Sequence, residues 1–132
     1  MPIARCGCGG LTASVDAYSP AVAACHCTGC QRRSGSPFGV GGYYPVAAVT
    51  IAGAHREWSR PATSGGPMVN SFCPVCGSTV FWRAAKHPAL IGIAAGAFAD
   101  PAFPPPLRSV WEEHKLAWVA VDATQHFDRA AS

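Results

Sequence analysis

The residues with the clearest capacity for chemistry are seven cysteines gathered in three short clusters. The clusters are Cys6-Gly-Cys8, Cys25-His-Cys27-Thr-Gly-Cys30 and Cys73-Pro-Val-Cys76, and no cysteine lies outside them. Thiolates this close in sequence can converge on one metal ion. A structural zinc site takes four protein ligands, whereas a catalytic site takes three and keeps one position open. Seven cysteines therefore predict one structural and one catalytic zinc site.

The spacing indicates which four cysteines share the structural site. Cys73 and Cys76 have the form of a zinc knuckle, in which Gly77 can adopt the positive φ that the turn requires. Cys6 and Cys8 lie two residues apart, so an extended backbone points both side chains to the same side. We therefore expect these two pairs to bind one ion.

The central cluster forms a second site by itself. Cys25 and Cys27 share one face of a strand, and Cys30 returns from the turn that follows. His26 then points away from both, so we expect it to be packed and not bound to metal. Four isolated histidines are expected at the surface or at the edge of the core: His55, His87, His114 and His126.

Other interpretations of the clusters remain open. Cys73 and Cys76 could join two members of the central cluster, but Cys6 and Cys8 would then lack a coherent site. An iron–sulfur cluster suits four thiolates better than three. Inert buried thiols do not account for three adjacent chelating sets. A fourth protein ligand would close the central site and make it structural.

Short β-strands must position these clusters, because 14 glycines and 12 prolines interrupt the 132 residues. Hydrophobic residues make up 49% of the chain and charged residues 13%, which favours a compact globule. We expect a small antiparallel β domain spanning residues 1–132, with a rigid proline loop at 101–106. Apolar or alternating segments predict one short helix at 29–33 and strands at 11–15, 21–25, 38–44, 46–51, 55–59, 69–73, 79–82, 90–93 and 118–121.

Composition argues against several classes of function. The formal charge of +3 comes from scattered residues, the longest basic run being Arg32-Arg33, so we expect no nucleic-acid partner. The N-terminus has no apolar stretch, so we expect no signal peptide. The longest apolar run, 89–99, is too short to cross a bilayer, so we expect no membrane partner. Clustered cysteines fit metal binding in the reducing cytoplasm, where we expect the protein to work.

The order of the clusters resembles that of a known family. Its motifs appear here as Cys6-Gly-Cys8-Gly9, Cys25-His-Cys27-Thr-Gly-Cys30-Gln31 and Phe72-Cys73-Pro-Val-Cys76-Gly77-Ser78, with Gly96–Pro101 and Lys115–Trp118 downstream. This pattern, from about Cys6 to Phe127, resembles the glutathione-dependent formaldehyde-activating enzyme (GFA) family, which also includes the centromere protein V domain. The resemblance implies a β-tent fold like that of methionine-R-sulfoxide reductase B domains.

The resemblance also implies an activity and a role for each cysteine. Cys6, Cys8, Cys73 and Cys76 match the structural zinc site, and Cys25, Cys27 and Cys30 match the catalytic zinc site. The implied enzyme is a zinc-dependent carbon–sulfur lyase of the S-(hydroxymethyl)glutathione synthase type, with two Zn²⁺ per chain and a small thiol substrate such as glutathione with formaldehyde. The alternatives are a non-catalytic zinc-stabilised binding module and a zinc enzyme with another class of substrate.

Basic and aromatic residues complete the predicted site. Arg32 and Arg33 follow the central cluster and could clamp substrate carboxylates in bidentate fashion, the alternative being an ordinary solvated pair. We expect Trp118 to be a core or pocket residue. Five further aromatic residues are expected to pack in the core or to line a pocket: Phe38, Tyr43, Tyr44, Trp82 and Trp111.

Overall fold

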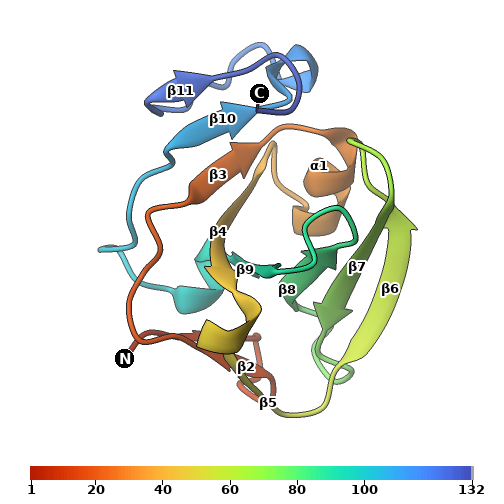
Figure 1. The fold of residues 1–132 in the computed structure, drawn as a ribbon, viewed down its shortest axis with the longest axis vertical. Coiled ribbons are helices and arrows are strands. Elements are labelled where there is room, and N and C mark those ends of the chain that lie inside the picture. The colour runs from red at the N-terminus through yellow and green to blue at the C-terminus, as the bar shows by residue number, and fades with distance from the viewer. Residues whose placement is uncertain (132) are drawn as a thin grey trace.

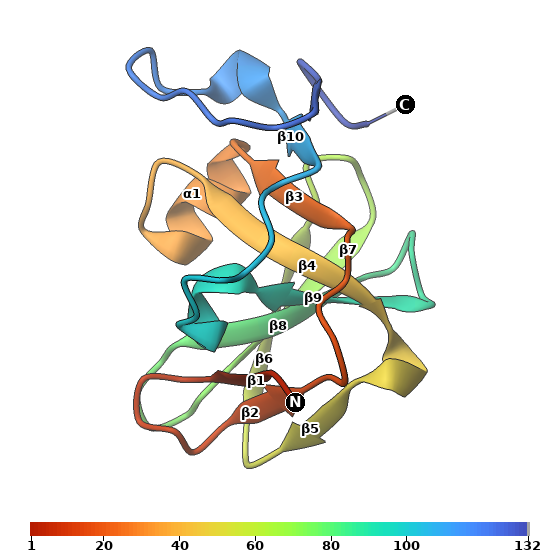
Figure 2. The ribbon, with the colours of Figure 1, turned by 90° about the vertical axis from the view of Figure 1, so that its left-hand side faces the viewer.

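The structure is a computed structural model that describes residues 1–131, and within them the fold is mainly β, as predicted. A small sheet contains β1 (Ile3–Arg5), β2 (Thr12–Ser14) and β5 (Thr50–Ala52). The strands pair in the order β1-β2-β5, and both pairs are antiparallel. Figure 2 shows this sheet at one end of the molecule and the C-terminal segment at the other.

A larger eight-stranded sheet runs in the order β11-β10-β3-β4-β9-β8-β7-β6. Its members are β3 (Val22–Cys25), β4 (Gly39–Pro45), β6 (Arg56–Pro61), β7 (Pro67–Phe72), β8 (Thr79–Ala84), β9 (Leu90–Ala94), β10 (Arg108–Val110) and β11 (Gln125–His126). Neighbours from β3 to β6 pair in antiparallel fashion, whereas β10 pairs in parallel with both β3 and β11. The sheet is therefore mixed at this edge, because the proline loop returns the chain in the direction of β3.

The α-helix α1 (Thr28–Ser34) packs beside β4 (Figure 1). It begins at the N-cap Cys27 and ends at Gly35, whose φ of 67° permits the left-handed cap. Three short 3₁₀ helices are η1 (Val46–Ala48), η2 (Ala95–Phe98) and η3 (Glu112–His114). In the described part of the chain, every helix is too short or too polar to cross a membrane.

The core lies between the small sheet and one face of the large sheet. Ile91 and Ile93 of β9 point into it, so the intervening residue Gly92 faces the opposite side, where the candidate site lies. The other large members of this core are Leu11, Tyr44, Val80, Phe81 and Phe98. One face of the large sheet thus packs in the core, and the opposite face carries the candidate site.

Two of the predicted strands are wrong in whole or in part. Segment 46–51 begins as η1, in which the N–H of Val49 donates to the carbonyl of Val46, and only its end belongs to β5. Segment 118–121 has no strand, and Trp118 is 76% exposed, so its expected burial is also wrong. The chain turns at 117–118, and within the segment only Val119 is buried. The seven other predicted strands overlap observed ones.

Candidate metal centres

The structure brings the seven cysteine sulfurs together in two groups. Within each group, every Sγ lies within 4.8 Å of the others. The four-cysteine site contains Cys6, Cys8, Cys73 and Cys76, and the three-cysteine site contains Cys25, Cys27 and Cys30. This is the four-plus-three grouping favoured from the sequence, not the alternative that mixes the knuckle with the central cluster. All seven cysteines are free thiols.

The donor set fits a zinc ion in chemistry and in spacing. Two thiolates on a tetrahedral zinc lie about 3.8 Å apart, since each Zn–S bond is about 2.3 Å long. The Sγ of Cys8 lies 3.6 Å from the Sγ of Cys6 and 3.6 Å from the Sγ of Cys73. The two groups could therefore each hold a metal ion, and sulfur ligands favour a thiophilic metal such as zinc.

Two similar loops form the four-cysteine site. The N–H of Cys6 donates to the carbonyl of Leu11, and the N–H of Cys73 donates to the carbonyl of Ser78, each at 3.0 Å. The N–H of Leu11 also donates to the Sγ of Cys6 at 3.2 Å, which favours its thiolate form. Gly77 has a φ of 78°, which confirms the positive φ predicted for the knuckle.

The pKa values at the four-cysteine site are pushed apart. Hydrogen bonding with the side chain and backbone of Ser78 lowers the pKa of the Cys76 thiol to about 5. At Cys8 the backbone N–H of Gly10 lowers the pKa, but the neighbouring thiols raise it more, to about 11. One ionised thiol therefore opposes ionisation of the next, and a bound cation would remove this repulsion.

The three-cysteine site sits where β3 passes into α1. Cys25 ends β3, Cys27 is the N-cap of α1, and Cys30 lies in its first turn. The Sγ of Cys27 accepts a hydrogen bond of 3.3 Å from the N–H of Cys30. Contacts with the sulfurs of Cys25 and Cys30 lower the pKa of Cys27, and contacts with Cys27 and Cys30 raise the pKa of Cys25. The helix predicted at 29–33 is confirmed, and it is this helix that returns Cys30 to the other two thiols.

His26 is buried and joins neither group of thiols, as expected. Its side chain is fully buried, and its Nε2 lies 2.9 Å from the Oγ of Ser109, which is also fully buried. The ring packs against Phe38, with the two centroids 5.4 Å apart. His26 belongs to neither sulfur group and instead fixes β3 against β10.

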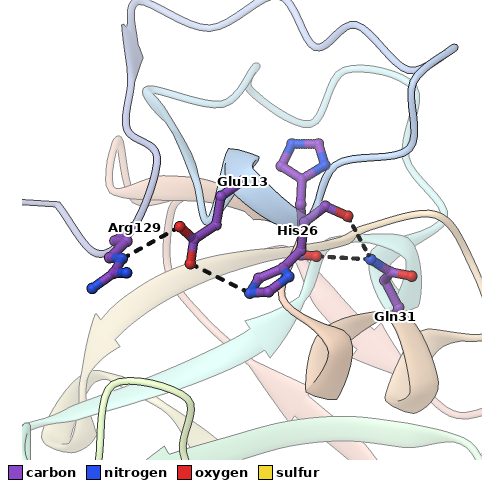
Figure 3. Close-up of polar contacts among 5 residues, drawn as sticks. His26, Gln31, Glu113 and Arg129 are labelled. Atoms are coloured by element: carbon purple, nitrogen blue, oxygen red, sulfur yellow. Dashed lines mark hydrogen bonds and ion pairs between the residues drawn. The ribbon is translucent and has the colours of Figure 1, made fainter.

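A set of polar contacts ties α1 to the C-terminal segment (Figure 3). The Nε2 of Gln31 donates to the carbonyl of His26 at 2.8 Å and to the carbonyl of His114 at 3.1 Å. Glu113 in turn contacts the side chains of His114 at 3.4 Å and Arg129 at 3.3 Å. Gln31 follows Cys30 directly, so these contacts hold the first turns of α1, and the thiols on them, in place.

A cavity of about 320 Å³ opens beside the three-cysteine site, and all three of its cysteines line it. Of the five aromatic residues considered from the sequence, Tyr43, Trp82 and Trp111 also line this cavity. Tyr44 belongs to the core, and Phe38 packs on the buried imidazole. None of the cysteines of the four-cysteine site lines the cavity, so the two sites have different surroundings.

Trp82 forms the floor of the cavity because two strands leave room for it. A Cβ atom on Gly41 would lie 2.5 Å from Cζ2 of Trp82, and a Cβ atom on Gly92 would lie 2.6 Å from its Cε2. The guanidinium carbon of Arg33 lies 4.1 Å from the centroid of the indole, a cation–π contact. Arg33 lines the cavity, whereas Arg32 is exposed and does not.

Several polar residues that line the cavity were missed from the sequence, and two of them lie on neighbouring strands. They are Arg60 in the edge strand β6 and Asn70 in β7. The register places Asn70 directly between Trp58 and Trp82 on the neighbouring strands. A signal was present, because Asn70 follows Val69 in a strand that reads as buried, and a buried amide requires partners.

Comparisons with known proteins bear on both the fold and the family. A family model described as "Glutathione-dependent formaldehyde-activating enzyme" matches residues 1–114. A crystal structure of a Rhodobacter sphaeroides protein is similar with a TM-score of 0.58 and 17% sequence identity, over 78% of this chain and 91% of that chain. At this identity, the likeness concerns the fold alone. No curated protein matches this chain.

Proposed function

This chain belongs to the glutathione-dependent formaldehyde-activating enzyme family, and we propose that it is a zinc-dependent carbon–sulfur lyase acting on a small thiol adduct. The family name points to glutathione and formaldehyde. In the forward direction, the thiol sulfur bonds to the aldehyde carbon and the thiol proton ends on the aldehyde oxygen, giving S-(hydroxymethyl)glutathione. In reverse, the same carbon–sulfur bond breaks. The observation that carries the proposal is the convergence of three thiols on the wall of a cavity.

We assign one zinc ion to each group of cysteines. The four-cysteine site offers a full tetrahedral set and has the character of a structural site. The three-cysteine site offers one ligand fewer, which is the number that a catalytic zinc takes from its protein. When bound there, the ion supplies positive charge that lowers the pKa of a substrate thiol beside it.

The residues around the three-cysteine site favour the reaction in two ways. Tyr43 and Trp82 wall the cavity, so thiol and aldehyde are held together and away from bulk water. Contact with Cys25 lowers the pKa of the Cys30 thiol, but contact with Cys27 and burial raise it overall, and the positive charge of Arg33 acts against this rise. The same positive charge favours an anionic thiol entering the cavity.

We further propose that residues 1–132 act as one zinc-binding domain in the cytoplasm. The four-cysteine site links loops at 6–11 and 73–78, and β10 returns to pair with β3, so distant parts of the chain depend on one another. A reducing compartment would keep all seven cysteines as thiols available to metal.

Metal content tests the assignment of the two sites. We expect elemental analysis to find two zinc ions in the wild type and one in Cys27→Ser, with the circular dichroism spectrum retained. Cys76→Ser serves as the matched variant in the other site, and we expect it to lower the thermal stability as well as the zinc content. A single zinc ion in the wild type would overturn the assignment.

Exchange between free and adduct-bound formaldehyde tests the activity. We expect the zinc-loaded wild type to accelerate the exchange seen by NMR in mixtures of glutathione and formaldehyde, and Cys27→Ser to lose the acceleration. Two bound zinc ions without any acceleration over the spontaneous reaction would reject this substrate pair and favour a zinc-stabilised binding module.

A further inference from the structure

A second, larger hollow adjoins the cavity on the side of β6, and its lining side chains carry an excess of positive charge. Its volume is about 960 Å³, and we call it the arginine groove because Arg32, Arg33, Arg56 and Arg60 line it. Glu57 is its only acidic lining residue. The formal charge of the lining is thus +3, equal to that of the whole chain, so the charged residues elsewhere balance one another.

The arginine groove and the cavity are two parts of one depression. Arg33, Arg60, Thr63 and Asn70 line both of them. The shared residues therefore form the boundary between the thiols of the three-cysteine site and the exposed arginines. A ligand with its sulfur in the cavity would have to pass this boundary to reach the groove.

The strand register builds a continuous surface across that boundary. Trp58 of β6 pairs with Asn70 of β7, and Asn70 pairs with Trp82 of β8, so the three side chains share one face of the sheet. Trp58 is 58% exposed, whereas Asn70 is 3% exposed and Trp82 is 5% exposed. The surface thus runs from an open edge strand to the buried floor of the cavity.

Two hydrogen-bond donors at the boundary have no acceptor. Among residues 1–131, the Nδ2 of Asn70 and the Nε of Arg60 are buried and have no hydrogen-bond partner. A buried donor without a partner destabilises a protein, so water or a bound ligand satisfies such groups in native structures. Both groups only donate, and one is cationic. The acceptor that fits them is an anion.

Both boundary arginines are held close to the three-cysteine site by glycines. A Cβ atom on Gly29 would lie 2.5 Å from the guanidinium carbon of Arg60, and a Cβ atom on Gly39 would collide with the guanidinium of Arg33. The Nη1 of Arg60 donates to the carbonyl of Pro61 at 3.0 Å, which fixes the group and leaves its Nε free. The described part of the chain pairs none of the groove arginines with an acidic side chain.

We propose that Arg60 and Asn70 bind a carboxylate of the thiol substrate and that the arginine groove takes the rest of its negative charge. The inference rests on the proposed function, which places the substrate sulfur at the three-cysteine site. The Nε–H of Arg60 and the Nδ2–H of Asn70 donate to the carboxylate oxygens, a charge-assisted pair. The substrate is accordingly a thiol with carboxylates several bonds from its sulfur, and these two residues select it over uncharged thiols.

Equilibrium binding tests this selection without any turnover. We would titrate the zinc-loaded protein by calorimetry with glutathione and with glutathione diethyl ester, which keeps the thiol and lacks free carboxylates. We expect the wild type to bind glutathione about tenfold more tightly than the ester, since hydrogen bonds to charged groups are the stronger ones. Arg60→Met should weaken glutathione binding by about tenfold and change ester binding less than about twofold.

A matched control and a second variant complete the experiment. Arg83→Met removes the same charge from the opposite face of β8, outside the cavity and the groove, and should leave both affinities unchanged. Asn70→Asp keeps the size of the side chain and replaces the donor by a carboxyl, so it should also weaken glutathione more than the ester. Both variants should keep the circular dichroism spectrum of the wild type.

The outcomes separate this inference from the proposed function. Equal wild-type affinities for the two thiols, or an equal loss for both in Arg60→Met, would overturn the carboxylate site. Discrimination between the thiols without any acceleration of adduct exchange would support the carboxylate site and reject the lyase. Acceleration of adduct exchange without discrimination between the two thiols would support the lyase and reject the carboxylate site.

Discussion

Replacing Gly92 by alanine tests directly how the floor of the cavity is built. The added methyl group would lie 2.6 Å from Cε2 of Trp82, well inside van der Waals contact. The indole cannot move aside freely, because it is 5% exposed and Arg33 stacks on it at 4.1 Å. A Cβ atom on Gly41 would lie 2.5 Å from Cζ2, on another edge of the same indole ring. The clash must therefore displace either the indole or the strands that carry it.

The magnitude follows from the cost of overpacking. Inserting a methyl group into a well-packed site costs about 1–3 kcal/mol. Replacing glycine by alanine recovers up to about 1 kcal/mol, because it restricts the unfolded chain. We therefore expect Gly92→Ala to lower the free energy of unfolding by about 1–2 kcal/mol. Gly96→Ala is the matched control, since no atom lies within 4 Å of its added Cβ, and it should be neutral or slightly stabilising.

Urea denaturation followed by tryptophan fluorescence would measure both variants. The free zinc concentration must be the same throughout, because metal binding adds to the apparent stability. Equal free energies of unfolding for Gly92→Ala and Gly96→Ala, or a Gly92→Ala variant more stable than the wild type, would refute the idea that these strands carry glycine to admit the indole.

Two side-chain pairs outside the site predict pH effects. The hydroxyl of Tyr18 donates to Asp100 at 2.6 Å, and this hydrogen bond raises the pKa of Tyr18 to about 12. In Asp100→Asn, tyrosinate absorbance should therefore rise at lower pH than in the wild type. An unchanged titration would contradict this prediction. The Nδ1 of His126 lies 2.7 Å from Glu112, and this contact raises the pKa of His126 above its ordinary value. Because the pKa of Glu112 is lowered from 4.5, this carboxylate is ionised above a pH of about 4.5, and from there up to about 6.5 the stabilisation is complete; it is lost as the pH rises through the raised pKa of His126. The difference in unfolding free energy between the wild type and Glu112→Gln should shrink over that range, whereas a difference independent of pH would contradict the prediction.

The grouping of the cysteines was predictable because its causes are local. Cys73, Cys76 and Gly77 form a turn whose geometry depends on a few adjacent residues, and the φ of 78° at Gly77 follows from the knuckle. Likewise, a short helix directly after Cys27 is enough to bring Cys30 back toward Cys25. Chelating spacing of this kind needs no knowledge of how distant strands pair.

The polar part of the cavity wall was not predictable, because strand register sets it. Arg60 and Asn70 become neighbours of the thiols only when β6, β7 and β8 pair as they do. The parallel pairing of β10 with β3 joins segments separated by more than 80 residues, and three-residue strands such as Arg108–Val110 carry almost no periodic signal. The segment 118–121 shows the converse error, since an apolar run was expected to pair with another strand and instead lies largely exposed.

Both sulfur sites consist of cysteine thiols, so they differ in their place in the topology. The four-cysteine site joins the loop after β1 to the loop between β7 and β8, and the contact between Cys8 and Cys73 spans 65 positions in the sequence. A metal ion there would close a long loop and so oppose unfolding. The three-cysteine site draws its ligands from residues 25–30 and closes no long loop, so metal binding there would contribute less to the fold. It lies instead at the end of a surface cleared by Gly41 and Gly92 and flanked by arginines. Its surroundings accordingly suit a bound thiol, and those of the four-cysteine site suit a cross-link.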